Sequence, residues 1–201
     1  SDAHGGVTYS LKSGLADDAG QFEIDASNGQ VRLSSVPDYE SGKTSYGFTV
    51  VAADRAGNTS ERQVNLSVND LNDHAPVFTS GGVGTVAENQ AISTVIYSAQ
   101  ASDADSTAAN QHISYSLAAG VDDQALLAID ANTGDVTLLA SANYEDKPSY
   151  SFTVIATNVG TGGTLSTRQA VTVSVSDVND LAPVFTSIGT GSVQENATIS
   201  T

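Results

Sequence analysis

Two short acidic segments hold the residues whose types and spacing could do chemistry. Residues 70–78 read D-L-N-D-H-A-P-V-F, and residues 177–185 repeat them almost letter for letter as D-V-N-D-L-A-P-V-F. Each places two aspartates and one asparagine within four residues, and a proline then prevents continuation as a helix. Unit charges a few ångströms apart repel by about 1 kcal/mol in water, and by more at a lower effective dielectric constant. Oxygen ligands crowded in this way are suited to a hard cation.

The composition is acidic throughout. The 201 residues contain 23 Asp and Glu against 7 Lys and Arg, a net charge of −16. This argues against nucleic acid and anionic membrane surfaces as partners, and it makes divalent cations the natural counterions. Cysteine is absent, so no disulfide framework is predicted. No apolar run approaches the roughly 18 to 20 residues needed for direct membrane insertion.

The acidic segments recur with the period of a domain. Three pairs of equivalent residues lie 105 to 107 positions apart: Asp25 and Asp130, Pro76 and Pro183, and Glu88 and Glu195. A unit of this length is a domain and not a solenoid repeat. We expect a first repeat at 1–76, a complete repeat at 77–183 and the first strand of a third repeat at 184–201. Because residues 1–3 match residues 102–104, the first repeat is expected to lack its first two strands.

Strand signals dominate each repeat. Short runs rich in Val, Ile, Thr, Tyr and Phe alternate with turns such as N-G, T-G and G-G, and no segment has a convincing helical pattern. The middle repeat contains seven predicted strands, at 83–88, 95–101, 113–117, 127–130, 135–139, 150–156 and 169–176. Seven strands in a unit of this size are typical of an immunoglobulin-like sandwich. The predicted fold class is therefore all-β, with tandem immunoglobulin-like seven-strand Greek-key sandwiches.

Alternation along the last two strands predicts which side chains form the core. Side chains two residues apart share one face of a strand, and the apolar face lies between the sheets. The predicted core positions are Tyr150, Phe152, Val154, Ala156, Val171, Val173 and Val175, with the first-repeat counterparts Tyr46, Phe48, Val50, Ala52, Val64, Leu66 and Val68.

Five motifs recur in order along the chain. They are the acidic linker at 70–73 and 177–180, a triplet at 38–40 and 143–145, Glu-Asn at 88–89 and 195–196, D-A-D at 103–105, and A-D at 53–54. Together they resemble the signature elements of tandem cadherin repeats over the whole chain. The resemblance implies the cadherin-type sandwich, with calcium ions, usually three per junction, bound between consecutive repeats.

Carried over residue by residue, the resemblance implies two sets of calcium ligands. Those of the first junction are Asp38, Glu40, Asp70, Asn72, Asp73, His74, Asp103, Asp105, Asn110 and Asn158, with His74 and Asn110 acting through main-chain carbonyls. Those of the second junction are Glu88, Glu145, Asp177, Asn179 and Asp180, which form half a site because no D-x-D follows. Such carboxylates and carbonyls can supply the roughly six to eight oxygens that calcium accepts.

Four positions depart from the cadherin pattern. His74 and Leu181 stand where the family has asparagine, which is expected to be harmless because that position binds through its backbone carbonyl. Asn158 replaces the aspartate of the sixth-strand motif, and Asn143 replaces the first aspartate of the triplet. Each of these two replacements removes a negative charge, so we expect weaker calcium binding there, with one ion fewer.

The resemblance implies an extracellular, calcium-dependent module of a cell-surface protein, acting in adhesion or as a spacer. The expected partners are neighbouring repeats, other cell-surface proteins or the same protein. Tryptophan is absent, so the strand exchange that anchors a Trp in animal cadherins is not available, which favours a spacer over homophilic adhesion. The absence of Cys, the low Lys content and the strands rich in Ala, Ser, Thr and Gly favour a large bacterial surface adhesin.

Other functional classes leave identifiable signals. An enzyme is not expected, because G-x-S-x-G, H-E-x-x-H and P-loop motifs are absent. A polysaccharide-binding module would need an exposed aromatic platform, whereas most of the 12 aromatic residues lie at predicted core positions. A metal-free structural sandwich would show no calcium-dependent stabilisation. Residues 186–201 also suggest head-to-tail self-association, by docking as a strand on the first repeat of another molecule.

Overall fold

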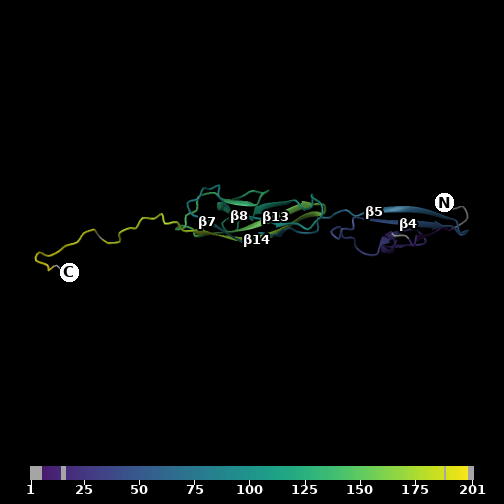
Figure 1. Ribbon diagram of the computed structural model, residues 1–201, viewed down its shortest axis with the longest axis horizontal. Helices are drawn as coiled ribbons and strands as arrows, with labels where there is room; N and C mark the ends of the chain where they lie inside the picture. The colour runs from purple at the N-terminus through teal and green to yellow at the C-terminus, as the bar shows by residue number, and fades with distance from the viewer. Residues whose placement is uncertain (1–5, 15–16, 188, 199–201) are drawn as a thin grey trace.

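The molecule is elongated, with two β units arranged end to end. The computed structural model describes residues 6–14, 17–187 and 189–198. In Figure 1, β4 and β5 mark the first unit, β7, β8, β13 and β14 mark the second, and the segment after β14 extends away from it. The expected equivalence of residues 1–3 with 102–104 lies outside the described residues.

The second unit is a sandwich of two sheets. One sheet has the strand order β10-β13-β14-β7, and the other has the order β11-β12-β8. The bounds are β7 (Val83–Ala87), β8 (Val95–Ser98), β10 (Ile113–Leu117), β11 (Leu127–Ile129), β12 (Asp135–Leu138), β13 (Ser149–Gly160) and β14 (Gly163–Ser176). All neighbours within these sheets are antiparallel except β7 and β14, which are parallel. A short pair, β6 (Val77–Phe78) with β9 (Ala101–Ser102), adjoins the linker.

The core of the second unit lies between its two sheets. All seven predicted core side chains are buried: Tyr150, Phe152, Val154, Ala156, Val171, Val173 and Val175. Side chains from the opposite sheet pack against them, with Val136 fully buried. Burial of a large apolar side chain stabilises the fold by about 1.5–3 kcal/mol. The all-β sandwich and the inward faces of these two strands are thus confirmed.

The first unit has a smaller core. β1 (Thr8–Leu11), β4 (Ser45–Ala53) and β5 (Thr59–Ser67) form one sheet, and β2 (Phe22–Ile24) pairs with β3 (Val31–Leu33). The buried residues of this core are Phe22, Tyr46 and Phe48. The prediction that Leu66 belongs to the core is wrong, because this side chain is 40% exposed. Within the described residues, no strand lies beside β5 as β7 lies beside β14.

Three predicted strands of the second unit show the largest differences from the observed ones. The predicted strands 150–156 and 169–176 are parts of the longer β13 and β14, which continue as a hairpin until Gly160 pairs with Gly163. The predicted strand 95–101 is divided into β8 and β9, which pair with different partners. The longer hairpin matters for the site, because its tip reaches the linker.

Two single helical turns were not predicted. They are the 3-10 turns η1 (Ala19–Gln21) and η2 (Gln124–Leu126). No helix in the described part of the chain is long and apolar enough to cross a membrane. Residues 177–187 and 189–198 contain no strand, so the first strand of a third repeat at 184–201 stays a prediction, since a strand forms only against a partner.

Candidate metal centre

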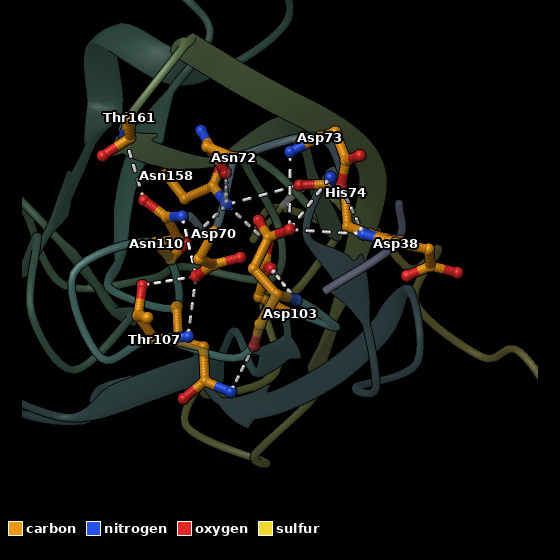
Figure 2. Close-up of polar contacts among 12 residues, drawn as sticks. Asp38, Asp70, Asn72, Asp73, His74, Asp103, Thr107, Asn110, Asn158 and Thr161 are labelled. Carbon is orange, nitrogen blue, oxygen red and sulfur yellow. Dashed lines mark hydrogen bonds and ion pairs between the residues drawn. The ribbon is translucent and has the colours of Figure 1, made fainter. Parts of the chain in front are cut away.

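The linker between the two units, residues 68–76, lies among loops of both (Figure 2). Glu40 comes from the loop between β3 and β4 of the first unit, residues 103–110 come from the loop after β9, and Asn158 lies near the end of β13. Two folded units and the segment that joins them therefore contribute to one cluster of polar side chains.

Three carboxylates from different segments converge in this cluster. Glu40, Asp70 and Asp105 each offer one oxygen that lies within 4.8 Å of the others. Glu40 Oε1, Asp70 Oδ1 and Asp105 Oδ2 are buried and have no hydrogen-bond partner among the described residues. A buried polar atom without a partner costs about 1–3 kcal/mol, and a charged one costs more. A cation among these three carboxylates would supply the missing partner, and an all-oxygen donor set is the kind that calcium prefers.

The other oxygen of Asp70 is held by the second unit. Asp70 Oδ2 accepts hydrogen bonds from Thr107 Oγ1 at 2.5 Å, from the Thr107 backbone N–H at 2.9 Å and from Asn110 Nδ2 at 2.9 Å. The Thr107 hydroxyl bond is the main cause that holds the pKa of Asp70 below its ordinary value. Thr107 was not predicted as a site residue, and its place two residues after D-A-D is the one signal that could have found it.

Asp105, which is fully buried, connects the linker to the D-A-D loop. Its Oδ1 accepts from the backbone N–H groups of Asp73 at 3.4 Å and His74 at 3.3 Å, and it lies 3.2 Å from His74 Nδ1. The hydrogen bond to Asp105, supported by the charge of Asp73, raises the pKa of the His74 imidazole. The cadherin resemblance implied a role only for the main-chain carbonyl of His74, whereas the His74 side chain lies at the site too.

Asn158 is fully buried at the centre of the hydrogen-bond network in Figure 2. Its Nδ2 lies 2.6 Å from Asp103 Oδ2, 2.8 Å from Asn72 Oδ1, 2.9 Å from Asn110 O and 3.4 Å from His74 O. The two main-chain carbonyls expected as ligands therefore face the same point as two of the expected side chains.

Burial raises the pKa of Asp103 above its ordinary value, and the neighbouring Asp105 carboxylate adds to this effect. The backbone N–H of Asp105 donates to Asp103 Oδ1 at 2.9 Å, which acts in the opposite direction and fixes the turn of the D-A-D loop. Two acids that oppose each other's ionisation in this way would both be favoured as carboxylates by a bound cation.

Asp38 and Asp73 lie at the exposed margin of the cluster. Asp73 lies with Glu40 and His74 in a second group of ligand atoms within 4.8 Å of one another. Among the described residues, Asp38 belongs to neither of these two groups of ligand atoms. Its Oδ1 accepts a hydrogen bond from the Ser41 backbone N–H at 3.1 Å.

At the far end of the second unit, Glu88 anchors the next acidic segment. It is 1% exposed, and it accepts backbone N–H bonds from Val178 at 2.6 Å and Tyr144 at 2.8 Å. These two hydrogen bonds lower the pKa of Glu88, and the bond from Tyr144 has the larger effect. Glu145 and Asp177 offer oxygens within 4.8 Å of it.

The remaining predicted residues of the second junction are more exposed. A backbone hydrogen bond favours the charged form of Glu145, but burial and the charges of Glu88, Asp180 and Asp177 outweigh it and raise its pKa. Asp180 accepts a hydrogen bond from Asn89 Nδ2 at 2.6 Å, and Asn179 is exposed.

Residues 83–176 match the sequence profile of the cadherin domain. This part of the chain is a cadherin domain. Its bounds run from the start of β7 to the end of β14, so the match covers the sandwich that lies between the two junctions. Cadherin domains occur as extracellular modules of cell-surface adhesion proteins. The homologues in this family are non-enzymatic, and cadherin domains are known to bind calcium at the junctions between domains.

Relatives extend the similarity over most of the chain. This chain is 35% identical over 184 residues to human protocadherin Fat 4 and to dachsous of Drosophila melanogaster. Each alignment covers 89% of this chain but only 4% of Fat 4 and 5% of dachsous. The solved structure of mouse cadherin-23 EC22-24 has a TM-score of 0.72 at 33% identity, over 89% of this chain and 58% of that one. These relatives are animal proteins, and the comparisons give no support to the bacterial surface adhesin that composition favoured.

Proposed function

We propose that this chain is a calcium-dependent spacer in an extracellular array of cadherin repeats, in which calcium makes the junction between the two units rigid. The observation that carries the proposal is the convergence of Glu40, Asp70 and Asp105, each with a buried oxygen that has no hydrogen-bond partner among the described residues. These residues belong to the first unit, the linker and the second unit. An ion bound by all three would fix one unit relative to the other.

Calcium suits this position better than magnesium does. It accepts roughly six to eight oxygens in flexible geometry, whereas magnesium demands a near-octahedral shell and keeps several waters. Extracellular modules bind calcium with dissociation constants of about 10⁻⁴ to 10⁻³ M, so millimolar calcium outside cells would occupy the site. Without an ion, the three carboxylates repel one another across 4.8 Å or less, and the units are free to reorient.

The proposed partners are neighbouring repeats of the array and, through the array, other cell-surface proteins or a second copy of the same protein. The structure of protocadherin gammaB7 EC3-6, with a TM-score of 0.66 and 29% identity to this chain, is that of a cis-dimer. This supports self-contact as a second role beside the spacer. Head-to-tail docking of residues 186–201 is a separate proposal, and a mass that stays monomeric at all concentrations in light scattering would contradict it.

Small-angle X-ray scattering in millimolar calcium and in excess chelator tests the spacer proposal. We expect a fixed maximum dimension in calcium and a broadened distance distribution in chelator. Glu40→Gln should broaden the distribution at a calcium concentration that keeps the wild type rigid. Glu23→Gln, on an exposed position of β2, removes the same charge away from the junction and should behave as the wild type. Superimposable wild-type curves would refute the proposal and favour a metal-free sandwich.

A further inference from the structure

The oxygen atoms around Asn158 form a cage that already holds a positively polarised group. Its Nδ2 lies between 2.6 and 3.4 Å from four oxygens, contributed by Asp103, Asn72, Asn110 and His74. A primary amide nitrogen carries two hydrogens, so it cannot give four full hydrogen bonds. Four oxygens directed at one point are instead the arrangement that surrounds a cation.

This cage differs from the cluster of Glu40, Asp70 and Asp105. There, three buried carboxylate oxygens lack a partner among the described residues. Around Asn158, the side-chain oxygens of Asp103 and Asn72 lie 2.6 and 2.8 Å from the amide nitrogen, and neither of them is an unpartnered buried atom in the described chain. At one end of the junction, buried carboxylate oxygens are left without a partner in the described chain. At the other end, an amide nitrogen of the protein occupies the point toward which the oxygens converge.

The equivalent position of the first unit is occupied by a carboxylate. Asp54, directly after β4, corresponds in sequence to Asn158 of β13. Asp54 accepts hydrogen bonds from Asn58 and Ala56 in its own loop. Asp54 can serve as an anionic ligand, whereas Asn158 brings no charge and directs an N–H donor into the cage. The third ion that the cadherin family leads one to expect at this end does not fit these residues.

We propose that the Asn158 amide takes the place of the third calcium ion of the first junction and docks the linker onto the second unit without metal. This inference rests on the proposed function, because it assumes that the junction binds calcium at its other positions. The amide supplies hydrogen bonds to the oxygens that a cation would otherwise collect. The junction then binds one ion fewer, and its two ends respond differently to calcium.

The tip of the β13–β14 hairpin completes this metal-free docking. The Asn72 backbone N–H donates to Thr161 O at 2.7 Å, and Asn72 Nδ2 donates to Gly163 O at 3.0 Å. Leu71 packs on Gly162, where an added Cβ would collide with the Leu71 side chain. These contacts involve no carboxylate, so chelation leaves them intact. Loss of calcium should therefore free the first unit to move relative to the linker, because the ion bound by Glu40 is lost. The linker itself should stay docked on the second unit.

Counting bound calcium tests the inference. Equilibrium dialysis at saturating calcium should give one more ion per chain for Asn158→Asp than for the wild type, because the new carboxylate removes the donor and adds a ligand charge. Asn132→Asp, at an exposed turn between β11 and β12, adds the same charge outside the junction and should leave the count unchanged. Hydrogen exchange of the wild type in chelator should show the Asn72 amide still protected.

The outcomes separate the inference from the proposed function. Equal, non-zero counts for the wild type and Asn158→Asp would overturn the inference and leave the calcium-dependent spacer standing. Rapid exchange of the Asn72 amide in chelator would also overturn it, and this measurement does not depend on whether the variant folds. The absence of bound calcium in all three proteins would refute the proposed function.

Discussion

Replacing Asp105 by asparagine should change stability in opposite directions with and without calcium. In chelator, the substitution removes one of the charges that converge with Glu40 and Asp70. The new Oδ1 can still accept the backbone N–H bonds of Asp73 and His74, which now reach Asp105 Oδ1. The new Nδ2 can donate to carboxylate oxygens that otherwise lack a partner. In calcium, the same change removes a ligand charge.

The size of the effect follows from the separation of the charges. Unit charges 4.8 Å apart repel by about 1 kcal/mol in water and by about 3 kcal/mol at an effective dielectric constant of about 20. Asp105 is fully buried and Glu40 is half-buried, so we expect a gain between these limits in chelator. Each kcal/mol corresponds to about 4–8 °C in melting temperature for a domain of this size. In calcium, each 1.4 kcal/mol of lost attraction weakens binding about tenfold.

Thermal melts followed by circular dichroism, in chelator and across a calcium titration, measure both signs. Glu23→Gln, the exposed control on β2, should change the free energy of unfolding by no more than about 0.5 kcal/mol, both in chelator and in calcium. A melting temperature that falls in chelator as much as it falls in calcium would refute the reasoning, because it would show that Asp105 contributes hydrogen bonds and packing but no repulsion that an ion relieves.

Two further predictions concern the packing of Gly160 against Asn110 and the dependence of stability on pH. Gly160→Ala should lower the free energy of unfolding by about 1–3 kcal/mol in urea, because the added Cβ would collide with Asn110 Oδ1. Gly81→Ala, whose Cβ meets nothing within 4 Å, is the control, and equal losses in the two variants would contradict this close contact. Asp123→Asn should reduce stability at neutral pH: burial opposes the ionisation of Asp123, but Lys147 Nζ at 2.8 Å holds its pKa below the ordinary value. The stability that ionised Asp123 contributes is present above its unfolded pKa and is lost as pH falls through its lower folded pKa. The melting temperatures of the wild type and Asp123→Asn should therefore converge once pH has fallen below that range. A constant difference across pH would argue against this ion pair.

The sandwich could be predicted because its determinants are local. Alternation fixed the inward faces of Tyr150, Phe152 and Val154, since side chains two apart always share a face of a strand. Leu66 follows the same alternation and is nevertheless exposed, because burial also depends on which strand lies beside β5. Periodicity within one strand carries no information about its neighbours.

The candidate site was predictable as a set of residues but not as an arrangement. Spacing in two copies indicated Glu40 and Asp70, and the single D-A-D motif indicated Asp105. The structure brings oxygens of these three residues within 4.8 Å of one another. The sequence shows that Asn158 replaces an acid, but it cannot show that the amide nitrogen lies among four oxygens. Thr107 belongs to no motif, and its contact with Asp70 depends on the path of the loop after β9.

The parallel pairing of β7 with β14 bears on how the array would carry mechanical load. The chain enters the second unit just before β7 and leaves it at the end of β14, and these strands run side by side from Val83 beside Thr172 to Ala87 beside Ser176. Tension along the molecule pulls β7 from its first residue and β14 from its last, in opposite directions along their common axis. The hydrogen bonds between them are loaded in shear and must break together, whereas a peeled hairpin loses them one at a time. This geometry resists extension, which is the property that a spacer under force requires.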